Sequence, residues 1–332
     1  MHTAPPELHF TEHVVKDHGS LALFWANMGS HIGIYQLSFA DGSAYIGQSV
    51  SARTRLATHR RRWTDAISVG FAPCVVERLN ELELAMIRYA EKTTPLRNKL
   101  LTNRPGGNED LVVTISPGRE LALPWMRSRR GVVTPPWPVV APAPAEKRKA
   151  RALFTRSNYP SVAAAAAALI AGGLPSPTET QAVLWSVSAL PSTNRTQGFR
   201  RLLTLSAGRL EILRIFEVVT ESSVAYPGVI NLAPGTRRRD LIDSLARTGL
   251  GPDALFIARY RAVAGVQSLE APDLDSLNRL LRDPVILNSV YQLVVTLMRQ
   301  GSAPLGRFHN RLVAKDLLDL AREQSTECLG IS

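Results

Sequence analysis

Five side chains in the first third of this 332-residue chain are of the types that phosphodiester hydrolysis requires, namely Tyr35, Tyr45, Arg55, His59 and Glu83. A phenol can take a proton from water if nearby cations lower its pKa from about 10. A guanidinium suits bidentate contact with phosphate oxygens. A single carboxylate can hold one divalent cation, with water and the phosphate of a substrate filling its other positions.

The two tyrosines lie in triplets, Gly-Ile-Tyr at 33–35 and Tyr-Ile-Gly at 45–47, on either side of a turn, and this pattern predicts a β-hairpin. A two-residue loop would place the tyrosines on opposite faces, because side chains alternate along a strand. A three-residue loop, with Gly42 in the left-handed region, pairs Leu37 with Tyr45 and puts both tyrosines on one face. We predict this second register, because a joint role for the tyrosines requires it.

Two helices and a third strand are expected to complete this part of the chain. The segment 50–63 predicts a helix on which Arg55 and His59, four residues apart, share a face. A strand is expected at 67–71, followed by a helix at 75–91 that carries Glu83 on an otherwise apolar side. The first helix is strongly basic, and we expect it to contact the phosphates of DNA through Arg53, Arg60, Arg61 and Arg62.

The triplets, with the order and spacing of the later residues, resemble the GIY-YIG nuclease family over roughly Ser30 to Lys99. The resemblance implies that Tyr35 takes part in activating the attacking water and that Tyr45 helps to orient it. It also implies that Arg55 binds the scissile phosphate. His59 occupies a position that is histidine or tyrosine in different members of the family.

The resemblance also implies a metal ligand. The metal-binding glutamate of the family lies four residues before an isoleucine, which selects Glu83 rather than Glu81, because Ile87 follows Glu83 at that spacing. The expected ion is Mg²⁺, or alternatively Mn²⁺.

Three further positions correspond to supporting residues of the family: Gly33, Gly47 and Asn98, the last of which is structural or supports the site. The chain departs from some members at Gln48, where they have a lysine directly after the second triplet. Arg53 or His59 would then have to lower the pKa of the tyrosine.

Composition favours a polyanionic partner, because 39 Lys and Arg stand against 28 Asp and Glu for a net charge of +11. The two cysteines, Cys74 and Cys328, indicate no disulfide framework or zinc site. No apolar run approaches the length of a membrane span. We therefore expect a cytoplasmic protein, associated with the nucleoid if the source is bacterial. Its expected partner is DNA, most simply double-stranded, and not a membrane.

The remainder of the chain carries no resemblance that we can place. The segment 116–156 is rich in proline and in basic residues, which predicts an extended linker. Period-two alternation is nearly absent beyond it, so helices are expected at 162–171, 179–190, 197–205, 209–219, 237–248, 252–263, 274–281, 285–299 and 312–323.

The expected fold class is an α+β GIY-YIG module, a small antiparallel sheet flanked by helices, followed by a mostly α-helical domain. Residues 1–29 would form a helical extension, 30–115 the GIY-YIG domain, 116–156 the linker, and 157–332 a helical domain for DNA targeting, partner binding or oligomerisation. The expected function is metal-dependent endonucleolytic hydrolysis of DNA. Two alternatives stay open: a DNA-binding or recruitment protein that keeps this fold without catalysis, and a nuclease that acts on RNA.

Overall fold

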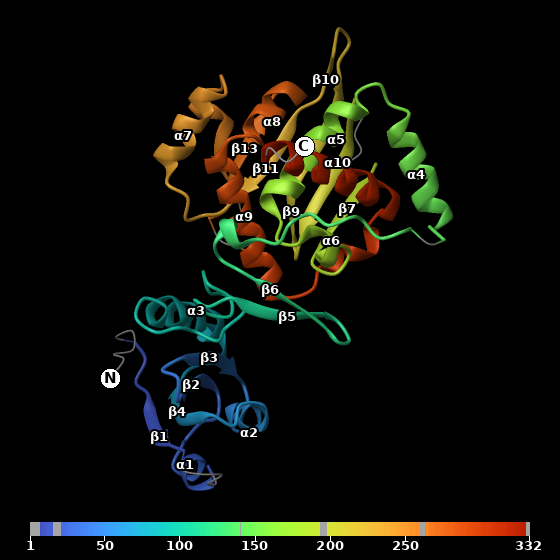
Figure 1. The fold of residues 1–332 in the computed structure, drawn as a ribbon. Coiled ribbons are helices and arrows are strands. Elements are labelled where there is room, and N and C mark those ends of the chain that lie inside the picture. Colours follow the sequence, from blue (N-terminus) through green and yellow to red (C-terminus); the bar gives the residue numbers. More distant parts are fainter. Residues whose placement is uncertain are drawn as a thin grey trace. The chain divides into compact units, whose positions relative to one another are not determined.

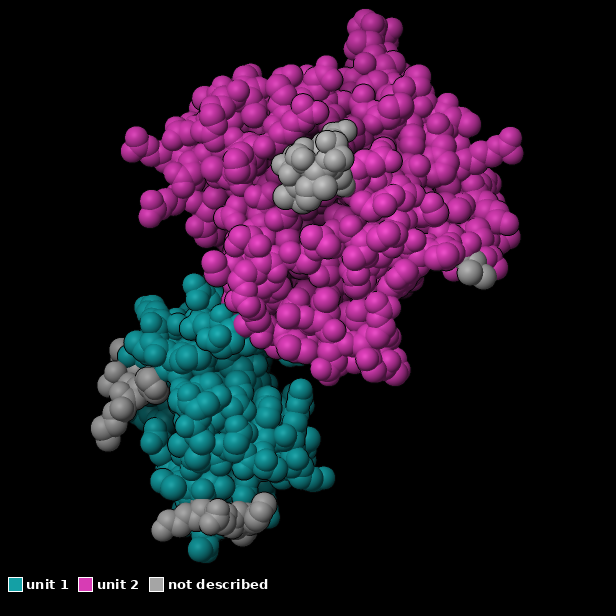
Figure 2. Space-filling model, in the orientation of Figure 1, with its two compact units in different colours: residues 1–109 teal, residues 110–332 magenta. Residues whose placement is uncertain are grey.

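The computed structural model describes residues 7–15, 21–139, 141–192, 198–258, 260, 263 and 265–329, and their side chains up to residue 325. The chain forms two compact units, residues 1–109 and 110–332, which Figures 1 and 2 show. Within the described residues, no helix has the length and apolar character needed to cross a membrane. The thiol of Cys74 is half-buried, and burial raises its pKa. The side chain of Cys328 lies outside the described residues.

The first unit is built on a four-stranded antiparallel sheet with the order β1-β4-β2-β3. Its strands are β1 (Thr11–Val14), β2 (Gly33–Phe39), β3 (Ala44–Ser49) and β4 (Ala66–Pro73). Its helices are α1 (Ala22–Ala26), α2 (Ala52–Arg62), the 3₁₀ turn η1 (Val76–Arg78) and α3 (Leu79–Ala90). The N-terminal segment therefore contributes a strand as well as a short helix, whereas a helical extension was expected there.

The sheet of the first unit has an apolar core on each face, because residues of β2 point alternately to opposite sides. Ile34 packs with residues of α3 such as Met86, and all are buried. Tyr35 and Leu37 pack on the other side with Leu56 of α2. The face that carries Tyr35 is thus the face that α2 covers.

The predicted register of the hairpin is confirmed. Leu37 pairs with Tyr45, and Tyr35 pairs with Gly47. The turn is closed by a hydrogen bond of 2.9 Å from the Phe39 amide to the Ser43 carbonyl oxygen. Gly42 has a φ of 78°, the left-handed conformation that a three-residue loop requires and that glycine adopts without strain.

The second unit is built on a seven-stranded sheet, in which six strands follow the order β12-β13-β11-β9-β8-β7 and β10 pairs with β9. Its strands are β7 (Trp185–Ala189), β8 (Phe199–Ala207), β9 (Leu210–Val219), β10 (Val224–Ala225), β11 (Gly228–Leu232), β12 (Leu255–Ile257) and β13 (Gln267–Ala271). A separate hairpin joins β5 (Leu111–Ser116) to β6 (Arg119–Leu123). Among the described residues of this unit, every pair of strands is antiparallel.

The second unit also contains several helices and 3₁₀ turns. They are α4 (Pro144–Phe154), α5 (Tyr159–Gly173), α6 (Pro177–Thr180), α7 (Arg238–Arg247), α8 (Leu274–Leu280), α9 (Pro284–Gln300) and α10 (Arg311–Leu329), with 3₁₀ turns η2 (Arg127–Arg129), η3 (Pro252–Ala254) and η4 (Pro304–Phe308). Helix α9 packs on β8, β9 and β11, and α5 packs on α8, α9 and α10 (Figure 1).

The expectation of a mostly α-helical second domain is wrong, because the segments predicted as helices at 197–205 and 209–219 are the strands β8 and β9. The segments at 179–190 and 252–263 likewise contain β7 and β12. The register of β8 against β9 shifts between Arg201 and Leu203 and again between Leu205 and Ser206. Such bulges place an extra residue in one strand and interrupt the period-two alternation by which a strand is recognised. The molecule is α/β in both units.

The segment predicted as a linker, 116–156, lies within the second unit, whose first residue is Asp110. Leu123 and Leu153 are fully buried in its core. The buried guanidinium of Arg299 in α9 donates to the carbonyl oxygen of Leu123 at 2.7 Å and lies 4.1 Å from the ring centroid of Trp125. Proline and charge signalled an extended backbone correctly at 130–139, but they gave no sign that the segment packs on a domain.

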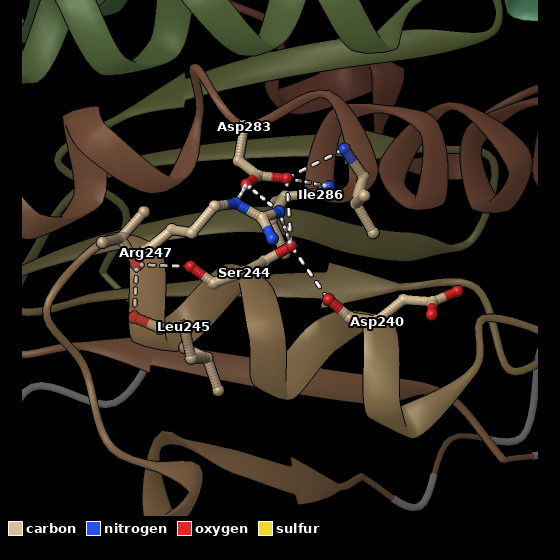
Figure 3. A network of polar contacts seen from close by, with 8 residues as sticks. Asp240, Ser244, Leu245, Arg247, Asp283 and Ile286 are labelled. Carbon is tan, nitrogen blue, oxygen red and sulfur yellow. Dashed lines mark hydrogen bonds and ion pairs between the residues drawn. The ribbon is translucent and has the colours of Figure 1, made fainter.

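A carboxylate at the start of α9 ties that helix to α7 (Figure 3). Asp283 is the N-cap of α9 and accepts hydrogen bonds from the amides of Val285 at 2.8 Å and Ile286 at 3.3 Å. It also accepts from the hydroxyl of Ser244 at 3.0 Å and from Nη2 of Arg247 at 2.6 Å. Burial raises the pKa of Asp283, but these hydrogen bonds outweigh burial and lower it overall. The carboxylate is therefore ionised and satisfied.

Acid is expected to destabilise the second unit through His309. This side chain is buried, its Nδ1 accepts from the Val187 amide at 3.3 Å, and burial lowers its pKa to about 4. The unfolded chain binds a proton near pH 6.5 while the folded chain does not, so stability falls as the pH drops from about 6.5 to 4. The loss should approach about 3 kcal/mol.

The measurement is urea unfolding at pH 7, 5.5 and 4. His309→Asn is the matched control, because its amide oxygen can accept the same hydrogen bond without titrating. The wild type should lose more stability than this variant over the interval. If the free energy of unfolding falls by the same amount with pH in both proteins, His309 is not the cause of the loss in acid.

Candidate active site

The centre of the site is a hydrogen bond between the hydroxyl of Tyr35 and Nε2 of His59, at 3.0 Å. Tyr35 comes from β2 and is 1% exposed, and His59 comes from α2 and is 8% exposed. The two meet because β2 turns Tyr35 toward the face that α2 covers, and because His59 lies on the buried side of that helix. Strand and helix together bury nearly all of both side chains.

Two glycines allow close packing around β2, and one of them, Gly47, makes room for Tyr35. A Cβ atom at Gly47, the cross-strand partner of Tyr35, would lie 2.5 Å from both Cζ and the hydroxyl oxygen of that side chain. A Cβ atom at Gly33 would lie 2.2 Å from the carbonyl oxygen of Ala72 on β4. Both distances are too short for any side chain, so these glycines support the site by packing.

Arg55 lies against the same hydroxyl, but it does not make Tyr35 acidic. Burial is the largest influence on the pKa of Tyr35 and raises it, and the neighbouring Tyr45 raises it further. The hydrogen bond and charge of Arg55 oppose this and are outweighed. The nearby cation thus lowers the pKa of this phenol as expected, but less than burial and Tyr45 raise it, and the overall shift is upward.

His59 is kept neutral. Burial lowers the pKa of its imidazole most, and the positive charges of Arg55 and Arg62 lower it further. A neutral imidazole has one nitrogen that can accept a proton. With Tyr35 protonated beside it, the pair consists of a phenol that can donate and an imidazole that can accept.

Tyr45 completes the aromatic part of the site, on the face that the predicted register gives it. It is half-buried, and its ring centroid lies 6.2 Å from that of Tyr35 and 5.0 Å from that of His59. The indole of Trp63 stacks on His59 at 4.9 Å and lies 4.8 Å from Tyr45. The sequence signal for Trp63 was only an aromatic residue at the end of a helix, and we missed its place in the site.

Glu83 stands on α3 beside the strand that carries the second triplet. It is half-buried, and burial raises its pKa, while hydrogen bonds from the side chain and backbone of Gln48 and the charge of Arg55 act to lower it. Nε2 of Gln48 also donates to Oδ1 of Asn80 at 2.6 Å. Arg55 thus acts electrostatically on both Tyr35 and Glu83, so the phenol and the carboxylate lie within range of the charge of one guanidinium.

The described residues contain no group of three or more His, Cys, Asp or Glu side chains arranged to hold a metal ion. A lone carboxylate still fits Mg²⁺, because this ion keeps several waters and is often held by one or two carboxylates together with substrate phosphates. The partial burial of Glu83, which disfavours its unpaired charge, agrees with such a role.

Asn98 has a structural role, one of the two roles that the resemblance implies for it. Its Oδ1 accepts from the Ile46 amide at 3.0 Å, and its Nδ2 donates to the Ile46 carbonyl oxygen at 2.7 Å. The neighbouring Ala44 bonds to Pro95 and Arg97 in the same way. The segment 95–98 is therefore tied to the outer edge of β3 by an isolated parallel bridge between Ala44 and Leu96 and by the side chain of Asn98.

The basic residues of α2 are mostly exposed. Arg53, Arg61 and Arg62 lie in solvent, whereas Arg60 is half-buried. The guanidinium of Arg62 lies 5.3 Å from the ring centroid of Trp63. The helix therefore presents positive charge to solvent on the side away from its buried residues.

Removal of the Asn98 amide should destabilise the first unit. Asn98→Ala leaves the amide and the carbonyl oxygen of the fully buried Ile46 without partners, which should cost about 1–3 kcal/mol. Denaturant unfolding measures the loss, and hydrogen exchange of β3 read by mass spectrometry locates it. Asn80→Ala, at an exposed position, is the control and should change stability by less than about 0.5 kcal/mol. Unchanged exchange in β3 would contradict this role for Asn98.

No protein-family model, curated protein or solved structure matches the chain. The resemblance to GIY-YIG nucleases is thus carried by the triplets, their register and the side chains that gather around Tyr35.

Proposed function

We propose that the first unit is a metal-dependent endonuclease that hydrolyses DNA phosphodiester bonds at a site of the GIY-YIG type. One observation supports this above the others: the hydroxyl of Tyr35 lies 3.0 Å from Nε2 of a neutral His59 and beside the guanidinium of Arg55. A proton acceptor and a phosphate-binding cation therefore meet at one oxygen atom.

The proposed base is the pair of Tyr35 and His59 acting together. As the attacking water loses a proton to the Tyr35 oxygen, the hydroxyl proton of Tyr35 passes to Nε2 of His59. The pair gains one proton overall, and it resides on the imidazole. This route avoids a free phenolate, which the burial of Tyr35 disfavours; the imidazolium that it forms is disfavoured by burial and by the charges of Arg55 and Arg62. Tyr45, the more exposed of the two phenols, orients the water.

Arg55 binds the scissile phosphate, because it is exposed on one side and faces the Tyr35 hydroxyl on the other. The other arginines of α2 hold the flanking phosphates, an interaction that carries no sequence preference. A Mg²⁺ or Mn²⁺ ion held by Glu83 would supply positive charge that stabilises the phosphate oxygens and the leaving oxygen.

DNA is the proposed substrate because the net charge of +11 and the basic face of α2 favour a polyanion. We assign DNA targeting or partner binding to the second unit, as a sheet-based domain in place of the helical one expected. The same assay with RNA in place of DNA distinguishes the RNA-cleaving alternative.

Loss of the Tyr35 hydroxyl should abolish most of the cleavage. Tyr35→Phe removes the oxygen through which the proton passes, and a positioned base contributes about 10²–10⁴-fold. Plasmid nicking with Mg²⁺ or Mn²⁺, against a chelator control, measures the rate, and a gel shift measures DNA binding, which should not change. Tyr89→Phe makes the same change on α3 and should cut normally. A Tyr35→Phe protein with wild-type turnover would exclude the proposed base.

The carboxylate of Glu83 should be required for cleavage and not for binding. Glu83→Gln keeps the shape of the side chain and removes the charge that holds the cation, so DNA should shift in a gel as with wild type while plasmid stays uncut at any Mg²⁺ concentration. Glu81→Gln, exposed on the same helix, is the control and should cut. Cutting by Glu83→Gln at the wild-type rate would remove Glu83 from the site. A wild type that binds DNA and never cuts it would favour the binding protein.

A further inference from the structure

Trp63 contacts His59, one of the two residues of the proposed base, through its backbone and through its ring. Its backbone amide donates to the carbonyl oxygen of His59 at 2.8 Å, which ends α2. Its indole is nearly parallel to the imidazole of the same residue, with 8° between the ring planes and 4.9 Å between centroids. One residue therefore fixes both the backbone and the ring of His59.

The indole is itself held in place. Its ring contacts that of Tyr45 at 4.8 Å, and it meets the fully buried ring of Phe39 edge to face at 5.6 Å. The guanidinium of Arg62 lies 5.3 Å from its centroid. Aromatic pairs at these separations attract one another beyond the effect of burying their surface. Phe39 belongs to β2, so the sheet supports the indole and the indole supports the histidine.

We propose that Trp63 is a positioning residue that holds the His59 imidazole in the plane that presents Nε2 to the Tyr35 hydroxyl. The proposal rests on the proposed function only for its catalytic consequence. The torsion that turns a histidine ring has broad, shallow minima, so hydrogen bonding alone leaves the ring some freedom. A flat, immobile surface beside the imidazole removes that freedom.

The stack also bears on the charge of His59. Burial is the first cause of the lowered pKa of this imidazole, and the indole occupies space beside the ring that water would otherwise fill. An indole cannot titrate, so it excludes water without adding a second charge that changes with pH. Position and protonation state of His59 thus depend on the same contact.

The first test observes His59 directly and does not depend on cleavage. The full-length protein carries labelled histidine, and His59→Gln assigns its resonances in an NMR titration without DNA. Trp63→Leu should move the pKa of His59 upward, toward its ordinary value. Trp63→Phe keeps a flat ring and should leave the titration close to wild type. If Leu and Phe variants both titrate as wild type, or both shift equally, the proposal is wrong.

The second test measures cleavage by the same variants. Trp63→Leu should lower kcat on the order of 10²-fold, the cost of a misplaced catalytic group, with KM unchanged and the acid limb of the pH–rate profile moved to higher pH. Trp63→Phe should restore most of the rate. A raised KM with unchanged kcat would mean that Trp63 binds DNA instead, and would overturn the positioning role.

Thermal unfolding accompanies both tests. If Trp63→Leu lacks the wild-type transition, Trp63→Met takes its place, because an unbranched apolar chain fills irregular space. A wild-type protein that cuts no nucleic acid would refute the proposed function, while the titration would still decide whether Trp63 positions His59.

Discussion

The pairing of Leu37 with Tyr45 across the β2–β3 hairpin is the constraint on which the candidate site depends. A slip of one residue would turn Tyr45 to the opposite face and leave Tyr35 alone beside α2. The turn that sets this register is held from outside by Arg97, which bonds to Asp41 at 2.9 Å and to Asp65 at 2.6 Å and lies 3.6 Å from the ring centroid of Phe39. The ion pairs are partly exposed and individually weak. Their effect is geometric, because one guanidinium joins the hairpin turn to the turn that precedes β4.

Burial of the site decides which groups can exchange protons. A tyrosine next to an arginine in water would become more acidic, but Tyr35 is almost wholly buried, and the cost of a desolvated phenolate exceeds the help from Arg55. The same burial disfavours the protonated form of His59, so its imidazole is neutral and has a free acceptor nitrogen, although it is a weaker base than an exposed histidine. One physical cause acts in opposite directions on an acid and a base, and the result is a neutral hydrogen-bonded pair.

The hairpin, the helices beside it and the candidate residues could be predicted because local signals there agree with the fold. Gly42 adopts the left-handed conformation that the turn requires, and residues four apart on α2 share a face. The upward shift of the pKa of Tyr35 and the position of Trp63 beside His59 could not be predicted from the sequence, because both depend on which residues pack around the side chain. The prediction for the second unit failed at the level of secondary structure. Residues 202–207 of β8 are all buried, so exposed and buried positions do not alternate there, and bulges add Leu202 to β8 and Ile212 to β9. Tertiary pairing overrides local pattern there.

Phosphate binding and proton transfer, the two steps of the proposed function, would fall to two differently charged regions of the first unit. These are the exposed arginines of α2 and the neutral pair of Tyr35 and His59. Arginine stays protonated at any working pH and cannot act as a base, so the exposed arginines of α2 can bind phosphate but cannot take a proton from water. Salt screens such exposed charges over about 10 Å at 0.1 M. The neutral pair of Tyr35 and His59 carries no net charge for salt to screen, and it lies out of solvent. Affinity for a polyanion and proton transfer at the phosphate therefore respond to different variables, ionic strength for the first and pH for the second. Arg55 belongs to both regions, because it is exposed to solvent and hydrogen-bonded to Tyr35.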